Sequence, residues 1–138
     1  MEWTTMRYLL ICSVALLSGC SLVDAYFMAK YDTTEHALIN RIGVHAAIYK
    51  DDCADHDKTK ANAAQLLVVA KELKNFSEHL PNNELTIKLV VPIHTMVDDL
   101  NKRYTEKEVS KTYCELKLQS ISNSADYVQK AIAKRPRT

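Results

Sequence analysis

Residues 113–132 read YCELKLQSISNSADYVQKAI, and they carry the cleanest helical pattern in the chain. Their apolar side chains recur at alternating steps of four and three residues, at Cys114, Leu118, Ile121, Ala125, Val128 and Ile132. That spacing places them on one face of an α-helix and forms the seam by which a helix packs in an antiparallel bundle. The sequence therefore predicts a last helix with one continuous buried face, which other helices must cover.

Two helices with apolar faces lie in the first half of the chain. The first begins at Asp32, which with Glu35 makes a carboxylate variant of the capping box, and ends near Lys50. The second covers about residues 59–80, where the following proline disfavours further helix. At helical spacing their faces comprise Leu38, Ile39, Ile42, His45, Ala46 and Tyr49, then Ala63, Leu66, Leu67, Ala70, Leu73 and Phe76. Each helix thus has one face to bury.

A third helix carries a proline inside its apolar pattern. Asn82 or Asn83 can cap this helix, and Pro92 removes one backbone hydrogen bond and kinks it. A short strand over residues 86–91 is the competing interpretation, disfavoured because a single strand would have no partner. The apolar face comprises Leu85, Leu89, Ile93, Met96, Val97 and Leu100. A kinked apolar helix packs imperfectly on its neighbours, which is one way to leave a groove.

The four helical segments together predict an all-α fold. Capping-box patterns at Thr105 and Thr112 indicate a short helical turn after Thr105 and a last helix that begins at Tyr113. Residues 134–137 are a basic, helix-breaking tail. Two glycines and three prolines leave little turn chemistry for a many-stranded sheet. We expect a four-helix up-down-up-down bundle over residues 32–138.

The first twenty residues are typical of an exported lipoprotein. Arg7 precedes an apolar run over residues 8–17, and the sequence Leu17-Ser18-Gly19-Cys20 resembles the bacterial lipobox. We therefore expect residues 1–19 to be removed as a signal peptide, Cys20 to be lipidated, and residues 20–31 to form a tether. Ser21, by resemblance to enteric lipoproteins, favours the outer membrane. An ordinary signal peptide that ends in a cysteine is the alternative, and translation can start at Met1 or Met6.

The remaining cysteines predict one disulfide. Of four cysteines, Cys12 falls in the signal peptide and Cys20 takes the lipid, which leaves Cys53 and Cys114. A disulfide is the default for an even pair in an oxidising compartment, and no Cys-x-x-Cys spacing suggests a redox or metal site. In the predicted bundle both lie at the end far from the membrane, so the bridge is geometrically possible.

Catalysis, cofactors and metals find little support in the sequence. Gly-x-Ser-x-Gly, His-Glu-x-x-His and phosphate-loop motifs are absent from it. The acidic stretch at residues 51–57 could suggest calcium, but it lacks the EF-hand order of ligands, and a solvated loop is favoured. A net charge of +1 gives no indication of a nucleic-acid partner. We therefore expect a non-enzymatic protein without cofactor or metal.

Residues 49–53, 113–118 and 135–137 carry a resemblance to a known family. A small helical lipoprotein with one cysteine ending the first helix and one opening the last resembles the pilotins of type II secretion systems, of the PulS/OutS type. The resemblance implies an outer-membrane lipoprotein that faces the periplasm. Such a protein binds the C-terminal segment of secretin subunits, directs them to the outer membrane and protects them from proteolysis.

The resemblance also implies an apolar groove in which the secretin segment, disordered until bound, folds as a helix. The candidate groove residues are Ile42, Ala46, Tyr49, Leu89, Ile93, Met96 and Leu100. For each of them a plain core position is the alternative. The rival function is a periplasmic immunity lipoprotein or a phage or plasmid exclusion lipoprotein. Proteins of that class usually meet a folded partner through exposed charged and aromatic side chains.

Overall fold

The structure, a computed structural model, describes residues 29–137. The predicted signal peptide, the lipidation site at Cys20 and most of the tether lie outside the described residues. The elements run in the order α2 (Thr33–Tyr49), a short 3-10 turn η1 (Lys50–Asp52), α3 (His56–His79), α4 (Glu84–Glu106) and α5 (Lys111–Ala133). The prediction of an all-α four-helix bundle is confirmed, and residues 86–91 are helical, so the alternative of a strand is wrong.

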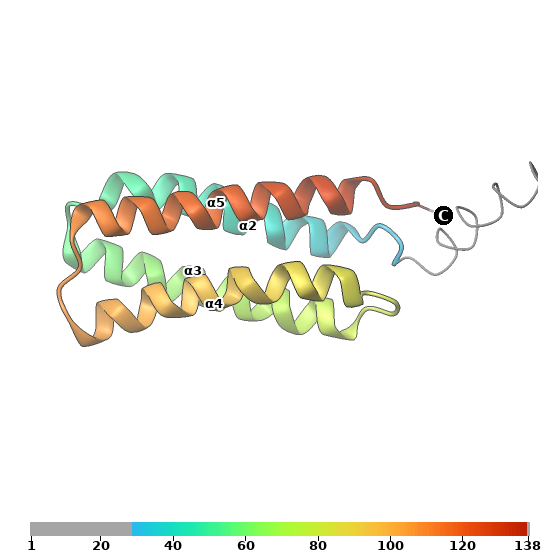
Figure 1. The fold of residues 1–138 in the computed structure, drawn as a ribbon, viewed down its shortest axis with the longest axis horizontal. Helices are drawn as coiled ribbons and strands as arrows, with labels where there is room; N and C mark the ends of the chain where they lie inside the picture. Colours follow the sequence, from blue (N-terminus) through green and yellow to red (C-terminus); the bar gives the residue numbers. More distant parts are fainter. Residues whose placement is uncertain (1–28, 138) are drawn as a thin grey trace, which may run out of the picture.

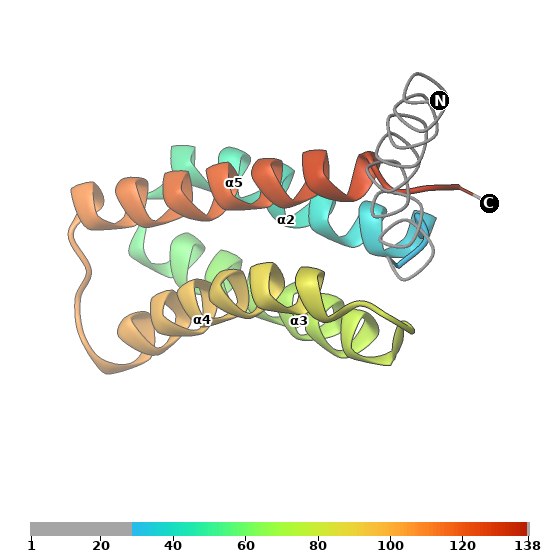
Figure 2. The same cartoon turned by 45° about the vertical axis from the view of Figure 1, so that its right-hand side comes forward.

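The helices run up and down in two layers. α2 and α5 lie side by side in one layer, and α3 and α4 lie in the other (Figures 1 and 2). Each helix contacts the two that neighbour it around the bundle, and the α4–α5 interface is the smallest of the four. Among residues 29–137, no helix has the length and hydropathy needed to cross a membrane.

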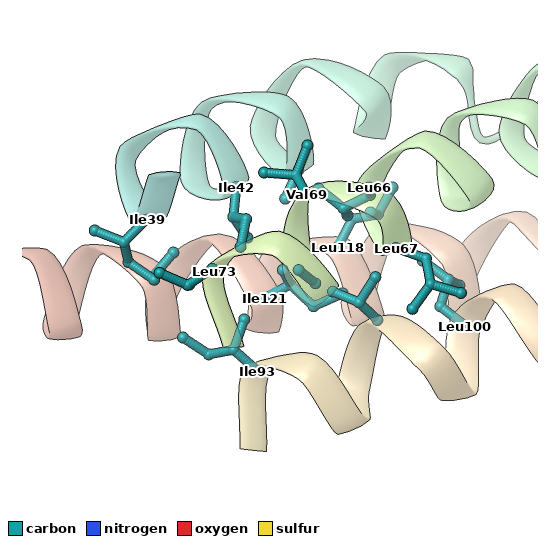
Figure 3. Close-up of a cluster of buried hydrophobic side chains, with 14 of the residues drawn as sticks. Ile39, Ile42, Leu66, Leu67, Val69, Leu73, Ile93, Leu100, Leu118 and Ile121 are labelled. Carbon is teal, nitrogen blue, oxygen red and sulfur yellow. The ribbon is translucent and has the colours of Figure 1, made fainter. Parts of the chain in front are cut away.

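The core forms where the four apolar faces meet. The predicted seam of α5 is buried at all six positions, from Cys114 to Ile132. Its partners come from every other helix, as Figure 3 shows for Ile42 of α2, Leu73 of α3 and Ile93 of α4. Burying a Leu or Ile side chain contributes about 1.5–3 kcal/mol each. The repeating apolar pattern therefore supplies most of the stabilisation that holds the helices together.

The helix boundaries depend on local capping, and the sequence predicted them only in part. Asp32 caps α2 as expected, accepting hydrogen bonds from the backbone N–H groups of Thr34 and Glu35. α3 begins earlier than predicted, because Asp55 accepts from the N–H of Lys58. Ser110 caps α5, so neither predicted capping box forms, and the residues after Thr105 do not make a separate helical turn.

The disulfide is present between Cys53 and Cys114, whose Cα atoms lie 5.7 Å apart. Cys53 follows η1 and Cys114 lies in the first turn of α5, so the bond ties together the loop after α2 and the start of α5. Both side chains are buried. The bridge lies at the end of the bundle opposite the two chain ends, as the up-and-down order of the helices requires.

The opposite end is closed by a buried polar cluster, which we call the end network: Glu35, Ser77, Asn83 and Arg135. One Glu35 carboxylate oxygen accepts from the Ser77 hydroxyl at 2.6 Å and from the Asn83 amide at 2.7 Å. The other pairs with the Arg135 guanidinium at 2.7 Å, and Arg135 also donates to the Asn83 side-chain oxygen at 2.8 Å. All four side chains are buried and mutually satisfied.

One prediction is wrong at this end. Glu35 does not complete a capping box, because its carboxylate points into the end network. The basic tail does end the last helix, at Ala133, and its Arg135 side chain is buried, with only 8% of it exposed. The chain ends also meet through the backbone, where the Tyr31 N–H donates to the Pro136 carbonyl at 2.8 Å. The guanidinium of Arg137 lies 4.9 Å from the centre of the Tyr31 ring.

Candidate partner-binding groove

A hollow of about 320 Å³ lies on the surface between α4 and α5, and we call it the α4–α5 groove. It is in the half of the bundle nearer the chain ends, since it uses the first part of α4 and the second part of α5. Its lining residues are Lys88, Leu89, Pro92, Ile93, Asn123, Ser124, Tyr127 and Val128.

The proline in α4 explains part of this shape. Pro92 has no N–H, so the carbonyl of Lys88 cannot accept the usual helical hydrogen bond from residue 92. On the facing helix, the small side chain of Ser124 contributes little volume where a large apolar residue would close the gap. Farther along the interface the two helices are joined, because Lys117 pairs with Asp99 at 3.9 Å. The groove thus opens where Pro92 of α4 and the small Ser124 of α5 border the same part of the interface.

Arg103 and Tyr113 hold the far end of the same interface. The guanidinium carbon of Arg103 lies 4.1 Å from the centre of the Tyr113 ring, a cation–π contact. This contact sits next to the loop between α4 and α5, and so it fixes the two helices beyond the groove. The walls of the groove therefore belong to helices that are anchored to each other and to the core.

The structure places the predicted groove residues differently from what we expected. Ile42, Ala46, Ile93 and Leu100 are at most 1% exposed and belong to the core. A partner has no access to Ile42, Ala46 or Leu100 in this conformation, whereas Ile93 touches the groove from below. Core and groove positions of a helix are equally apolar, so the sequence pattern alone could not separate these buried residues from groove residues.

The other three predicted residues are partly exposed. Leu89 lines the α4–α5 groove, and Met96 lies two turns further along α4, half-buried against the core. Tyr49 is on α2, where its hydroxyl donates to the Gln65 side chain of α3 at 3.0 Å. α2 contributes no side chain to the lining of this groove. The hollow is thus formed by α4 and α5, whereas the sequence analysis paired α4 with α2, whose Ile42 and Ala46 are buried.

Sequence reasoning missed the wall that α5 provides. Ser124 and Tyr127 each stand one position before a seam residue, Ala125 and Val128, and they line the groove. Tyr127 is 66% exposed. The available signal was an aromatic residue that flanks the seam on the side of α4. Leu85, predicted to be buried, is also exposed, one turn before Leu89.

The lining has an apolar floor and a polar rim. Leu89, Pro92, Ile93 and Val128 form the apolar part, and Tyr127 offers a large ring with a hydroxyl at its tip. Apolar grooves with amphipathic aromatic residues at the rim are typical of sites that bind a helix through its apolar face. By contrast, a second hollow, between α2 and α5, is lined largely by polar side chains that include Asn40, Asp126 and Gln129.

The acidic stretch at residues 51–57 has structural partners. Asp52 accepts from the Asn62 amide at 2.8 Å and lies 3.9 Å from the Lys58 ammonium, and Asp55 caps α3. Within residues 29–137 no group of three His, Cys, Asp or Glu side chains is arranged to hold a metal ion. The α4–α5 groove is therefore the candidate binding site.

Comparisons with known proteins do not assign the chain to a family. It matches no known protein family, no curated protein and no solved structure.

Proposed function

We propose that this protein is a lipid-anchored binding module of the type II secretion pilotin kind. In this proposal the α4–α5 groove holds a helical segment from the C-terminus of a secretin subunit. The observation that carries the proposal is the groove itself, with its apolar floor beside Pro92 and the exposed Tyr127 at its rim. No reaction is catalysed, and neither a cofactor nor a metal takes part.

The overall architecture is consistent with such a role. A bound helix needs a stable surface, and here the groove lies on a bundle closed by the disulfide at one end and by the end network at the other. The chain ends lie in the same half of the molecule as the groove, so a lipid at Cys20 would hold a captured segment close to the membrane surface. We propose that the lipid directs the complex to the outer membrane, where the secretin assembles.

The folding cost of the segment and the small contact area together give an expected affinity. A segment that is disordered before binding loses conformational entropy when it folds, which reduces the affinity per unit of contact area. A short groove of this size gives a modest apolar contact. We therefore expect a dissociation constant on the order of 1 μM, which corresponds to about 8 kcal/mol.

Calorimetry tests the proposal directly. We expect residues 21–138, with the disulfide intact, to bind a peptide from the C-terminus of a type II secretin of the same genome. The peptide should gain helix by circular dichroism. Absence of binding would overturn the proposal for that secretin and favour an immunity or exclusion lipoprotein that meets a folded partner.

A variant that fills the groove tests whether the peptide binds there. Ser124→Trp places a large side chain in the α4–α5 groove, and we expect it to weaken peptide binding about tenfold or more, since blocking a hot-spot pocket costs on the order of 1–2 kcal/mol. Ala64→Trp on the exposed side of α3 is the matched control and should leave the affinity unchanged. Thermal unfolding of both variants must stay near wild type. Equal binding by both variants would place the partner elsewhere.

A further inference from the structure

The α4–α5 groove has an uneven charge distribution. Of its eight described lining residues, Lys88 alone is charged, and its side chain is exposed. The four other lysines of α4 and α5 have carboxylate partners, in the pairs Lys102–Asp98, Lys111–Glu115, Lys117–Asp99 and Lys130–Asp126. Lys88 makes no ion pair with any residue between 29 and 137. The groove therefore presents one ammonium group at its rim with no acidic side chain in the lining to balance it.

Position 88 also has an unusual backbone. Because residue 92 is proline, the Lys88 carbonyl lacks its usual donor, and both residues line the groove. One residue thus offers a cation and a carbonyl acceptor beside an apolar floor. A partner with only an apolar face would leave both polar groups without a protein partner.

We propose that Lys88 makes the α4–α5 groove selective for an amphipathic helical segment that carries a carboxylate beside its apolar face. The inference rests on the proposed function in taking a helical segment as the occupant. It adds the chemical class of that segment, with an Asp or Glu side chain paired to the Lys88 ammonium. A segment with a basic side chain at that place would be rejected by like charge.

The geometry also limits the length of the segment. The apolar stripe of α4 that borders the groove extends from Leu85 past Leu89 to Met96, about 16 Å along the helix axis at 1.5 Å per residue. A bound helix of about three turns covers that distance. Its carboxylate lies about one turn from one end of the segment, next to an apolar anchor residue, since Lys88 is adjacent to Leu89 and lies much closer to Leu85 than to Met96 along the stripe.

The proposed ion pair between Lys88 and the segment lies at the exposed rim, and this position determines which measurements are sensitive to it. A rim charge contributes modestly to affinity and strongly to the association rate and its dependence on salt. We expect Lys88→Glu, which replaces attraction by repulsion, to weaken binding about five- to tenfold at low salt and to flatten the salt dependence. Lys60→Glu makes the same charge change on the exposed side of α3 and should change affinity by less than about twofold.

The experiment uses two synthetic peptides and residues 21–138. Both are amphipathic three-turn helices with the same apolar positions, and one carries Glu and the other Lys at the flanking position one turn from the end that meets Leu85. We expect wild type to prefer the Glu peptide and Lys88→Glu to prefer the Lys peptide. Equal binding of both peptides by wild type and by Lys88→Glu would overturn the inference and leave the proposed function standing. Absence of binding to these peptides and to the secretin peptide would overturn both.

Discussion

Arg135→Ala is expected to lower the free energy of unfolding by about 3 kcal/mol, because it leaves the Glu35 carboxylate buried without its cation. Removing one partner of a buried ion pair is more costly than the pair is stabilising, since the remaining charge cannot regain its hydration. Urea denaturation followed by circular dichroism measures the change. The loss would be a large fraction of a typical stability of about 5–15 kcal/mol.

Two further variants test the cause. Arg137→Ala removes an exposed arginine two residues away, whose contact with Tyr31 contributes about 0.5–1 kcal/mol at most. The double variant Glu35→Ala/Arg135→Ala should cost less than the sum of the two single changes, because it leaves no lone charge. If Arg135→Ala and Arg137→Ala have equal, small effects, the C-terminal residues do not hold the end network together in solution.

Loss of the disulfide is expected to have the largest effect on stability. Cys53→Ala/Cys114→Ala should lower the free energy of unfolding by about 4 kcal/mol, because the bond closes a loop with a sequence separation of 61 in the unfolded chain. Native packing adds to this value, because both cysteine side chains are buried. Unfolding of wild type with and without a reductant should reproduce the difference.

The disulfide prediction has its own control. Reductant should leave the stability of the double alanine variant unchanged, since no bond remains to be broken. Far-UV circular dichroism of that variant at low temperature should still show a helical protein, because the apolar core remains. A stability loss below about 1 kcal/mol would mean that the core alone restricts the chain as much as the bond does.

The sequence predicted the bundle because apolar periodicity reports directly which face of a helix is buried. The seam from Cys114 to Ile132 has this property at every position, and it is buried throughout. Asp32 was also predictable, since its bonds to Thr34 and Glu35 are local. Glu35 was not, because its partners Ser77, Asn83 and Arg135 stand 42, 48 and 100 residues away.

The groove was predictable on one side only. Pro92 marks α4 in the sequence, and Leu89, a predicted groove residue, lines the hollow that the structure shows. Which helix faces that part of α4 depends on how the four helices pack together, and periodicity does not give this. The choice of α2 was wrong for that reason, and Ser124 and Tyr127 of α5 were missed. Ile42, Ala46 and Leu100 were grouped with the groove because core and groove side chains are equally apolar.

The position of the end network has a mechanical consequence. A pulling force that enters the chain ahead of Tyr31 meets the Tyr31–Pro136 backbone bond and the Glu35–Arg135 ion pair before it reaches the rest of α2. These contacts pass the load to the end of α5, through Asn83 to the start of α4, and through Ser77 to the end of α3. α4 and α5 are also the two helices that form the α4–α5 groove. In the proposed function, the tether and the bound segment are thus connected through one half of the bundle, and the half that holds the disulfide carries little tension.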